Sequence, residues 1–303
     1  MEQFYKVSSS PHIRSKNKIE TVMRDVLIAL LPATIFSVYY FGIEALMVII
    51  VSILSCIIAE YLWQKITKQK VTINDYSAVI TGLLLAFNVP SSVPLWVVAI
   101  GGFFAIIVVK QIFGGLGQNF VNPALAARAF LLASWPTYMT IFKIDGITTA
   151  TPLAILKEGG DLPAFTNVLF GTIGGCIGET SAFLLIVGGI YLMVRKVISY
   201  KIPVTYIGTV FILTYIFGGN GFYEIFAGGL ILGAFYMATD YSTSPVTPLG
   251  QIIMGIGCGV LTTVIRKFGG YAEGVSYSIL LMNLAVPLID RYTKPRIFGE
   301  VKK

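Results

Sequence analysis

Long apolar stretches, separated by short polar or basic connections, dominate the chain. A helix that spans a bilayer needs about 20 mostly apolar residues, and most of these stretches come close to that length. The pattern therefore predicts an all-α membrane protein with about ten transmembrane helices, whose ends are good to a few residues. The predicted crossings are 25–43, 44–63, 77–91, 95–113, 120–138, 180–198, 203–218, 222–238, 249–265 and 271–289.

Several of these predicted crossings are interrupted. The third is short and contains Asn88 and Pro90, and the ninth follows the proline-containing run 244–248. The glycine-rich run 170–178 is apolar but short, so it is a candidate re-entrant segment. Broken helices are tolerated at membrane depth only where protein or a cavity covers their backbone. They often mark binding sites.

Lysine and arginine are distributed unequally across this topology. Of the 22 Lys and Arg residues, seventeen fall in inner segments and four in outer segments if the N-terminus is inside, and Arg128 lies within a span. Basic residues favour the cytoplasmic side of a membrane. The tails 1–24 and 290–303 and the loop 195–201 are therefore predicted to be cytoplasmic, and the long loop 139–165 extracytoplasmic.

That outer loop divides the chain into a first membrane half, 25–138, and a second, 166–289, each with five crossings. An odd number of crossings inverts the second half relative to the first, a plan common in transporters.

A short internal echo accompanies this division. Asp-Tyr-Ser occurs at 75–77 and at 240–242, and each copy precedes a Phe-Gly-Gly, at 113–115 and 268–270. The topology puts the two Phe-Gly-Gly turns on opposite faces, as inversion requires. It puts both Asp-Tyr-Ser turns on the same face, which inversion does not require.

Composition supports a membrane protein. Hydrophobic residues make up 55% of the chain and charged residues only 12%, against roughly 25% charged residues in soluble domains. The net charge of +7 is spread through the connections, so topology explains it better than a nucleic-acid partner does. The three cysteines, Cys56, Cys176 and Cys258, each stand alone in an apolar run. We therefore expect buried thiols and no iron–sulfur or zinc site formed by this chain alone.

The outer loop contains the run Asp145-Gly-Ile-Thr148-Thr149-Ala-Thr151-Pro152. Three threonines in four residues, followed by proline, predict an extended or turn segment. From the residues alone, a polar connection with a few hydroxyl caps explains this run.

The same run resembles the flavin-attachment sequence of the RnfD/NqrB family, Ser/Thr-x-Ala-Thr, in which the last threonine carries FMN through a phosphoester bond. In this sequence that position is Thr151. Thr148 and Thr149 stand where the family often has serine and glycine. Because the N-terminal tail has only 24 residues, the chain resembles the RnfD branch more than the NqrB branch.

Further segments, in the same order as in the family, extend this resemblance over nearly the whole chain. They are Gly115-Leu-Gly-Gln-Asn119-Phe-Val-Asn122-Pro-Ala124 continuing to Arg128, Gly178-Glu179-Thr-Ser-Ala182, Ala238-Thr-Asp240-Tyr-Ser-Thr-Ser-Pro245, and Gly269-Gly-Tyr-Ala-Glu273-Gly274.

The resemblance implies membership of an ion-translocating Rnf complex, which passes electrons between reduced ferredoxin and NAD and couples this to Na⁺ or H⁺ movement. It implies a fold like that of urea channels, with inverted halves of five helices. It also implies covalent FMN on Thr151, attached by a flavin transferase, a noncovalent riboflavin, and the A, B, C, E and G subunits of the Rnf complex as partners.

Polar residues near or within the spans are the other functional candidates, because a charge in lipid is costly. Glu179, Asp240 and Glu273 are candidate ion-coupling acids, whereas we expect Glu60 to be an end-of-helix charge in the headgroup zone near Lys65.

Arg128 is expected to pair with an acid or with a polar edge of a flavin, because it lies within an apolar span. Asn119 and Asn122 are expected either to bind an isoalloxazine or to cap a broken helix. Asp145, Thr148 and Thr149 flank the attachment position.

Two functions fit these observations. One is an electron-transferring membrane protein, for which a single flavin at the outer face is not enough, because the hydrocarbon core is about 30 Å thick. A second redox centre, on this chain or on a partner, would be needed. The other is a solute channel or transporter of urea-channel-like fold, which would have no use for the threonine run.

Overall fold

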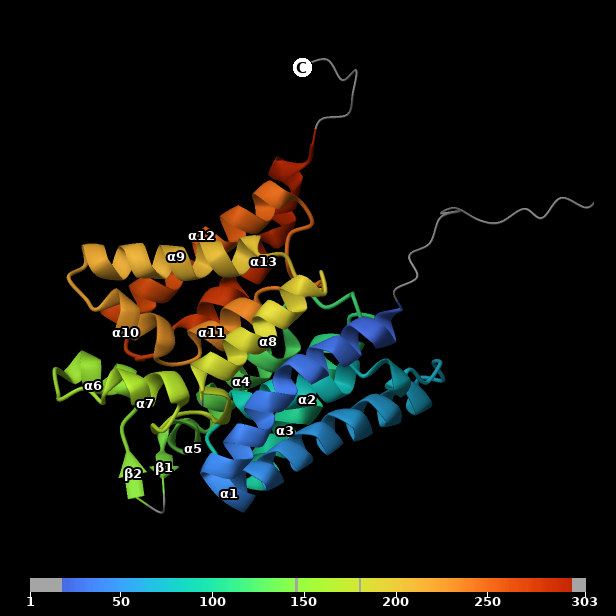
Figure 1. The fold of residues 1–303 in the computed structure, drawn as a ribbon. Helices are drawn as coiled ribbons and strands as arrows, with labels where there is room; N and C mark the ends of the chain where they lie inside the picture. The colour runs from blue at the N-terminus through green and yellow to red at the C-terminus, as the bar shows by residue number, and fades with distance from the viewer. Residues whose placement is uncertain (1–17, 145–146, 180, 296–303) are drawn as a thin grey trace, which may run out of the picture.

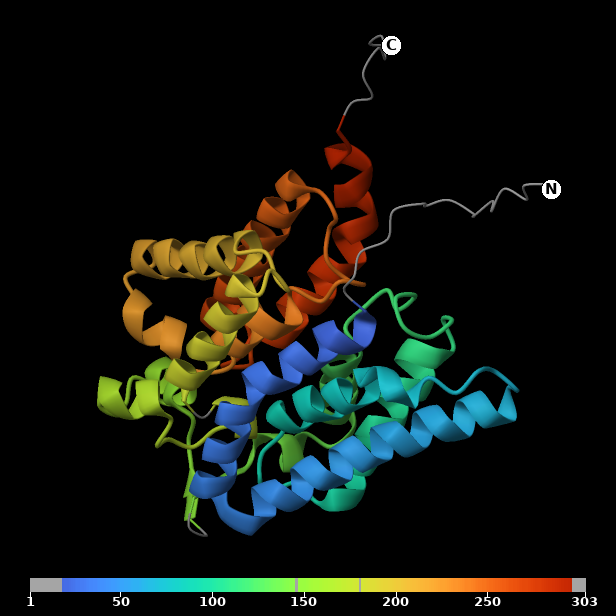
Figure 2. The same ribbon diagram turned by 45° about the vertical axis from the view of Figure 1, so that its right-hand side comes forward.

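The computed structural model describes residues 18–144, 147–179 and 181–295. These residues are predominantly helical and include one short antiparallel hairpin. Figures 1 and 2 show the first helix, α1, folded back on itself at one end of the molecule, beside the hairpin. The beginning and the end of α1 lie at the opposite end.

Helix α1 (Ile19–Ile66) contains both of the first two predicted crossings. Gly42 interrupts it with φ 70° and ψ −153°, a conformation that glycine adopts with little steric cost. The interruption makes two segments that run in opposite directions, and the bend lies within two residues of the predicted boundary. Because α1 begins at Ile19, the predicted tail 1–24 is too long by several residues.

The remaining helices of the first half are short. The second segment of α1 packs against α2 and α3, and ten of the eleven residues of α2 are buried. The elements are η1 (Ile73–Asp75), α2 (Ser77–Phe87), α3 (Leu95–Phe103), its π-helical continuation η2 (Phe104–Gln111), α4 (Pro123–Ser134) and α5 (Pro136–Thr140).

The predicted outer loop contains regular structure. Strand β1 (Phe142–Ile144) pairs with β2 (Ile147–Thr149), and α6 (Pro152–Glu158) follows. The candidate re-entrant segment then continues α7 (Phe165–Phe170) through turns to η3 (Ile177–Glu179). There the Ile177 amide donates to the Val89 carbonyl at 3.0 Å, and both residues are buried, so this segment packs inside the protein against the connection that follows α2.

The second half contains two longer helices, α12 and α13, and an interrupted stretch at the predicted eighth crossing. Helix α9 packs lengthwise on α12, and α12 on α13. The elements are α8 (Ala182–Val194), α9 (Lys201–Ile216), α10 (Gly221–Phe226), α11 (Leu230–Leu232), π-helical η4 (Gly233–Met237), α12 (Pro248–Phe268) and α13 (Val275–Thr293).

Much of the apolar surface of these helices is not covered by the rest of the chain. Tyr39 on α1 is 84% exposed, and Val204 on α9 and Leu288 on α13 are largely exposed as well. Soluble monomers rarely leave so much contiguous apolar surface in water. Two of the described helices, Ile19–Ile66 and Pro248–Phe268, are long and apolar enough to cross a membrane, and five others are apolar but shorter.

A buried ion pair joins α1 to η2. Lys110 Nζ lies 2.9 Å and 3.2 Å from the two carboxylate oxygens of Glu60 and donates to Ser77 Oγ at 2.6 Å. Gln111 Nε2 donates to the same carboxylate at 2.7 Å. The expectation that Glu60 is a headgroup-zone charge near Lys65 was wrong: Glu60 is 1% exposed. Lys110 is also buried, so it does not belong with the loop charges among which it was counted.

We predict that Lys110→Met strongly destabilises the protein. The substitution leaves the Glu60 carboxylate buried without its counter-charge, which typically costs about 3–5 kcal/mol. Lys65→Met is the control, because Lys65 is exposed and only lies over the Tyr61 ring. Thermal unfolding of the detergent-solubilised variants measures the difference. Equal melting temperatures for the two variants would contradict the structural role of the pair.

Candidate functional site

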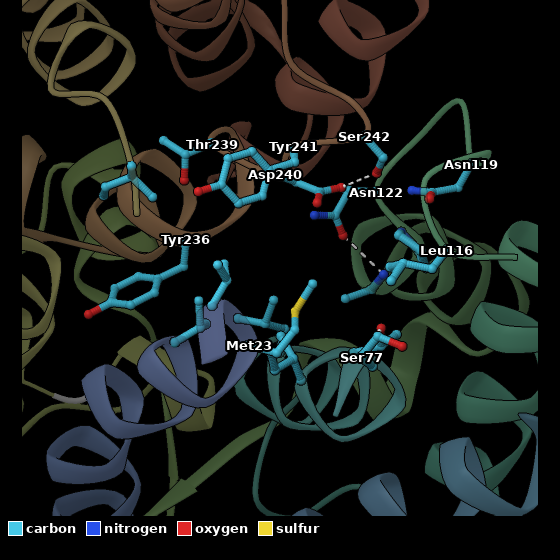
Figure 3. Close-up of a pocket in the computed structure, with 18 of the residues that line it drawn as sticks. Met23, Ser77, Leu116, Asn119, Asn122, Tyr236, Thr239, Asp240, Tyr241 and Ser242 are labelled. Carbon is cyan, nitrogen blue, oxygen red and sulfur yellow. Dashed lines mark hydrogen bonds between the residues drawn. The ribbon is translucent and has the colours of Figure 1, made fainter. Parts of the chain in front are cut away.

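A first cavity, here the asparagine pocket, encloses about 780 Å³ between the two halves. It is lined by the start of α1, by α2, by the connection around Asn119 and Asn122, by the end of α8, and by η4 with the following Asp240. Figure 3 shows Asn122 and Asp240 on one side of the pocket, opposite Met23 and Ser77. The pocket therefore combines apolar walls with a few polar groups, as small-molecule sites do.

Asn122 has a structural task in this pocket. Its Oδ1 accepts from the amides of Ala124 and Leu125 at 3.0 Å and 3.3 Å, which caps α4, and its Nδ2 donates to the Met237 carbonyl at 3.4 Å. Asn119 Nδ2 donates to the Val121 carbonyl at 3.1 Å. Of the two expectations for these asparagines, capping describes Asn122. Neither capping nor a turn contact prevents the pair from lining the cavity.

The two Asp-Tyr-Ser turns come together here. Asp75 Oδ1 accepts from the Ser77 amide and hydroxyl at 2.8 Å and 2.6 Å, and Asp240 Oδ2 accepts from the hydroxyls of Ser242 and Thr243 at 2.8 Å and 3.1 Å. Ser77, Asp240 and Ser242 line the same pocket. The turns therefore lie at one end of the molecule, as the topology has them.

A second cavity, here the threonine pocket, encloses about 770 Å³ and brings together Thr151, Arg128, Glu179 and Glu273. Arg128 forms an ion pair with Glu273 at 2.5 Å. Its guanidinium also donates to Ser276 Oγ. The other carboxylate oxygen of Glu273 accepts from the amide of Gly229 at 2.7 Å. Arg128 thus pairs with an acid, which is one of the two partners expected for it.

Thr151 stands at the N-terminus of α6. Its backbone is extended, with φ −70° and ψ 152°, and its Oγ1 accepts from the Ala154 amide at 3.3 Å. The extended conformation agrees with the effect of Pro152 on the preceding residue. We expected an exposed hydroxyl, which was wrong. Thr151 is only 7% exposed, because it faces the threonine pocket rather than open water.

The residues that precede Thr151 belong to the hairpin. Thr149 pairs with Phe142 in the β-ladder, and its Oγ1 is buried without a hydrogen-bond partner. Thr148 pairs with Lys143 through the backbone, while its side chain lies outside those described. Asp145 also lies outside the described residues.

Glu179 reaches the threonine pocket from the turn η3. Glycines make that turn possible. A Cβ at Gly175 would lie 2.5 Å from the Glu179 carboxylate, and a Cβ at Gly178 would lie 2.5 Å from Phe87 Cβ. The Gly-Gly-Cys-Ile-Gly-Glu sequence therefore packs the backbone closely enough to bury an acid.

Helix α4 connects the two pockets. Its first residues line the asparagine pocket, and Arg128 lines the threonine pocket one and a half turns later. The α11–η4 segment runs between the same pockets in the opposite direction, from the Gly229 amide that binds Glu273 to Tyr236 in the asparagine pocket. The pockets are therefore separate but share two walls.

Three polar groups around these pockets were not anticipated from sequence. The Lys110–Glu60 pair borders the asparagine pocket, and Asn283 fills a buried position on α13. In the amide orientation that satisfies both ends, Asn283 accepts from the Asn122 amide and donates to the Thr243 carbonyl, each at 3.1 Å. A single lysine inside the apolar run 104–113 was the signal that could have identified the pair.

The fold and pockets define a helical, membrane-type protein with two enclosed small-molecule sites. A family model described as the NQR2, RnfD, RnfE family matches residues 6–299. This chain therefore belongs to the NQR2, RnfD, RnfE family, and the resemblance of its motifs is confirmed.

Curated relatives match nearly full length, and each is the D subunit of a complex. That of the Na(+)-translocating ferredoxin:NAD(+) oxidoreductase complex of Acetobacterium woodii is 53% identical, over 98% of this chain and 96% of the relative. That of the proton-translocating ferredoxin:NAD(+) oxidoreductase complex of Clostridium ljungdahlii is 46% identical, over 98% and 97%. That of the ion-translocating oxidoreductase complex of Aliivibrio salmonicida is 34% identical, over 98% and 99%.

We predict that Gly178→Ala destabilises the protein by about 1–3 kcal/mol, the usual cost of overpacking a buried site. Its methyl group would collide with Phe87 and Leu232. Gly270→Ala is the matched control, since nothing lies within 4 Å of its Cβ position, and it should change stability by about 0.5 kcal/mol or less. Thermal unfolding of the two variants checks this, and a loss of equal size in both would argue against close packing at Gly178.

Proposed function

We propose that this chain is the membrane-embedded RnfD component of an Rnf-type complex, which couples electron transfer between ferredoxin and NAD to translocation of Na⁺ or H⁺. The observation that carries the proposal is similarity over almost the full length to the corresponding components of such complexes. One of these relatives is named for Na⁺ and the other for protons, so the family permits either ion. The chain acts with the A, B, C, E and G subunits of the Rnf complex and has no complete activity alone.

We further propose ten transmembrane helices in two inverted halves of five, with urea-channel-like architecture. Helical segments occur at each predicted crossing. Arg195, at the end of α8, pairs with Asp25, near the start of α1, at 3.1 Å. The connection 195–201 therefore lies at the end where α1 begins, while the hairpin lies at the other end (Figure 1). This arrangement supports cytoplasmic termini and an extracytoplasmic flavin-bearing loop.

We propose that FMN is attached to Thr151 through a phosphoester bond made by a flavin transferase. The threonine pocket suits a flavin, because its volume falls within the roughly 300–1,000 Å³ of small-molecule pockets. Its hairpin side also contains Thr149, whose buried hydroxyl oxygen lacks a partner. The cofactor supplies the redox chemistry. Thr151 anchors it, and Arg128 sets a fixed positive charge beside it.

A second, noncovalent flavin in the asparagine pocket would complete an electron path between the two ends. We propose riboflavin, with Asn119, Asn122 and Asp240 as the polar groups around it. The size and mixed lining of the pocket support this assignment, and so does the thickness of the hydrocarbon core, about 30 Å, which is too great for one flavin to bridge. Glu179, Asp240 and Glu273 are the acids we propose for ion coupling, because each lines one of the two pockets.

We predict that Thr151→Ala abolishes covalent flavin, whereas Thr149→Ala retains it. Only Thr151 occupies the attachment position, and its hydroxyl faces the threonine pocket. Because Thr151 caps α6, its loss should also cost roughly 0.5–2 kcal/mol of stability, which is small enough to leave the chain folded. In-gel flavin fluorescence after denaturing electrophoresis measures attachment, and electron transfer through the complex should fall sharply.

Two outcomes separate the alternatives. Covalent flavin that survives in Thr151→Ala would show that the motif alignment is wrong. A wild-type chain from the assembled complex that never carries flavin would remove the main support for a redox role and favour a solute channel.

We predict that an engineered Gly160→Cys reacts with a membrane-impermeant thiol reagent added to intact cells, and that Lys68→Cys does not. Both positions are exposed, and they lie on opposite sides of the proposed topology. Background labelling should be low because Cys56, Cys176 and Cys258 are buried. The reverse labelling pattern would overturn the topology and the location of the flavin with it.

A further inference from the structure

Two carboxyl groups meet in the threonine pocket. Glu179 comes from η3 and Glu273 from the connection ahead of α13. Their side chains are in hydrogen-bond contact, and both line the pocket. An ionised carboxylate has only acceptor oxygens, so two of them cannot hydrogen-bond to each other. The contact therefore requires a proton on one of the two acids.

The surroundings decide which acid carries it. Glu273 is held as a carboxylate, because one oxygen pairs with Arg128 at 2.5 Å and the other accepts from the Gly229 amide at 2.7 Å. Among the described residues no cation forms an ion pair with Glu179, which is 7% exposed and packs over Gly175. Arg128 is already engaged by Glu273 and Ser276. The proton belongs on Glu179.

We propose that Glu179 is a proton-binding site, a carboxylic acid that donates its hydrogen bond to Glu273 beside the attachment threonine. With the proton in place, the two acids and Arg128 have no net charge, and loss of the proton leaves one negative charge. The other groups that face this cluster are the Cys176 thiol and the tyrosines at the pocket wall. Charge changes in a low-dielectric site are felt strongly by neighbouring groups.

One consequence rests on the proposed function. A proton retained on Glu179 favours an electron arriving at a flavin on Thr151, and a proton lost from it opposes that electron. Glu179 would therefore act as a positioning residue for charge, which makes the flavin potential depend on pH, without touching the reacting atoms itself.

The test is infrared difference spectroscopy of the purified complex, in which a protonated carboxylic acid gives a C=O stretching band that shifts in heavy water. We expect such a band in the wild type and its loss in Glu179→Gln. That variant should assemble normally, because an amide can donate to Glu273 as the protonated acid does. Glu158→Gln, at an exposed position, is the control and should keep the band.

Three results would overturn the proposal: a wild type without the band, a band that persists in Glu179→Gln, or a Glu179→Gln chain that fails to assemble while Glu179→Asp assembles without a displaced band. If both variants fail to assemble, Glu179 is only a structural residue, and that outcome also contradicts the proposal.

A companion measurement separates this site from the attachment of flavin. The band should remain in Thr151→Ala, which lacks the flavin anchor but keeps both acids. Where flavin is attached, its midpoint potential should vary less with pH in Glu179→Gln than in the wild type. Absence of flavin from the wild type would remove the second readout and leave the infrared test intact.

Discussion

The ion pair between Arg128 and Glu273 joins residues 145 positions apart in the chain. A charge removed from water must find a partner, because its desolvation penalty is otherwise uncompensated. The other described ion pairs also join separate helices: Glu60 to Lys110, Asp25 to Arg195, and Glu224 to Lys267. Pairing of buried charge thus constrains how these short and interrupted helices can pack, and both pockets depend on that packing.

Interrupted helices give the pockets their polar groups. A continuous helix satisfies its own backbone, whereas a helix that ends inside the protein leaves amides and carbonyls free for other partners. The start of α4 uses the Asn122 side chain for this purpose, and the Gly229 amide, ahead of α11, binds Glu273. The same breaks that require capping therefore orient the asparagines and acids toward the cavities. This explains why the family motifs coincide with helix ends.

The helical segments could be predicted from hydropathy because apolar length alone decides them, and the bend at Gly42 fell near a predicted boundary. The contacts of Lys110 could not. Its partner Glu60 lies 50 residues away, and local sequence contains nothing about which distant helix will lie beside it. The proximity of Lys65 in sequence suggested a partner for Glu60 that geometry does not provide. The candidate residues show the same division. The pattern around Thr151 predicted its extended backbone, because proline acts on the residue directly before it. Its burial depends on α4 and the connection before α13, which pack around it from elsewhere in the chain. Likewise, Glu179 stood out as an acid in an apolar run, but its contact with Glu273 arises only when η3 folds against the second half.

A flavin held at Thr151 is the feature on which the proposed redox role depends most directly. Mass spectrometry of the intact chain, taken from the assembled complex, tests this without any assumption about activity. The mass should exceed that of the polypeptide by one FMN less one water, and fragmentation should locate the addition at Thr151. An unmodified mass, or a flavin located at another residue, would contradict the central claim.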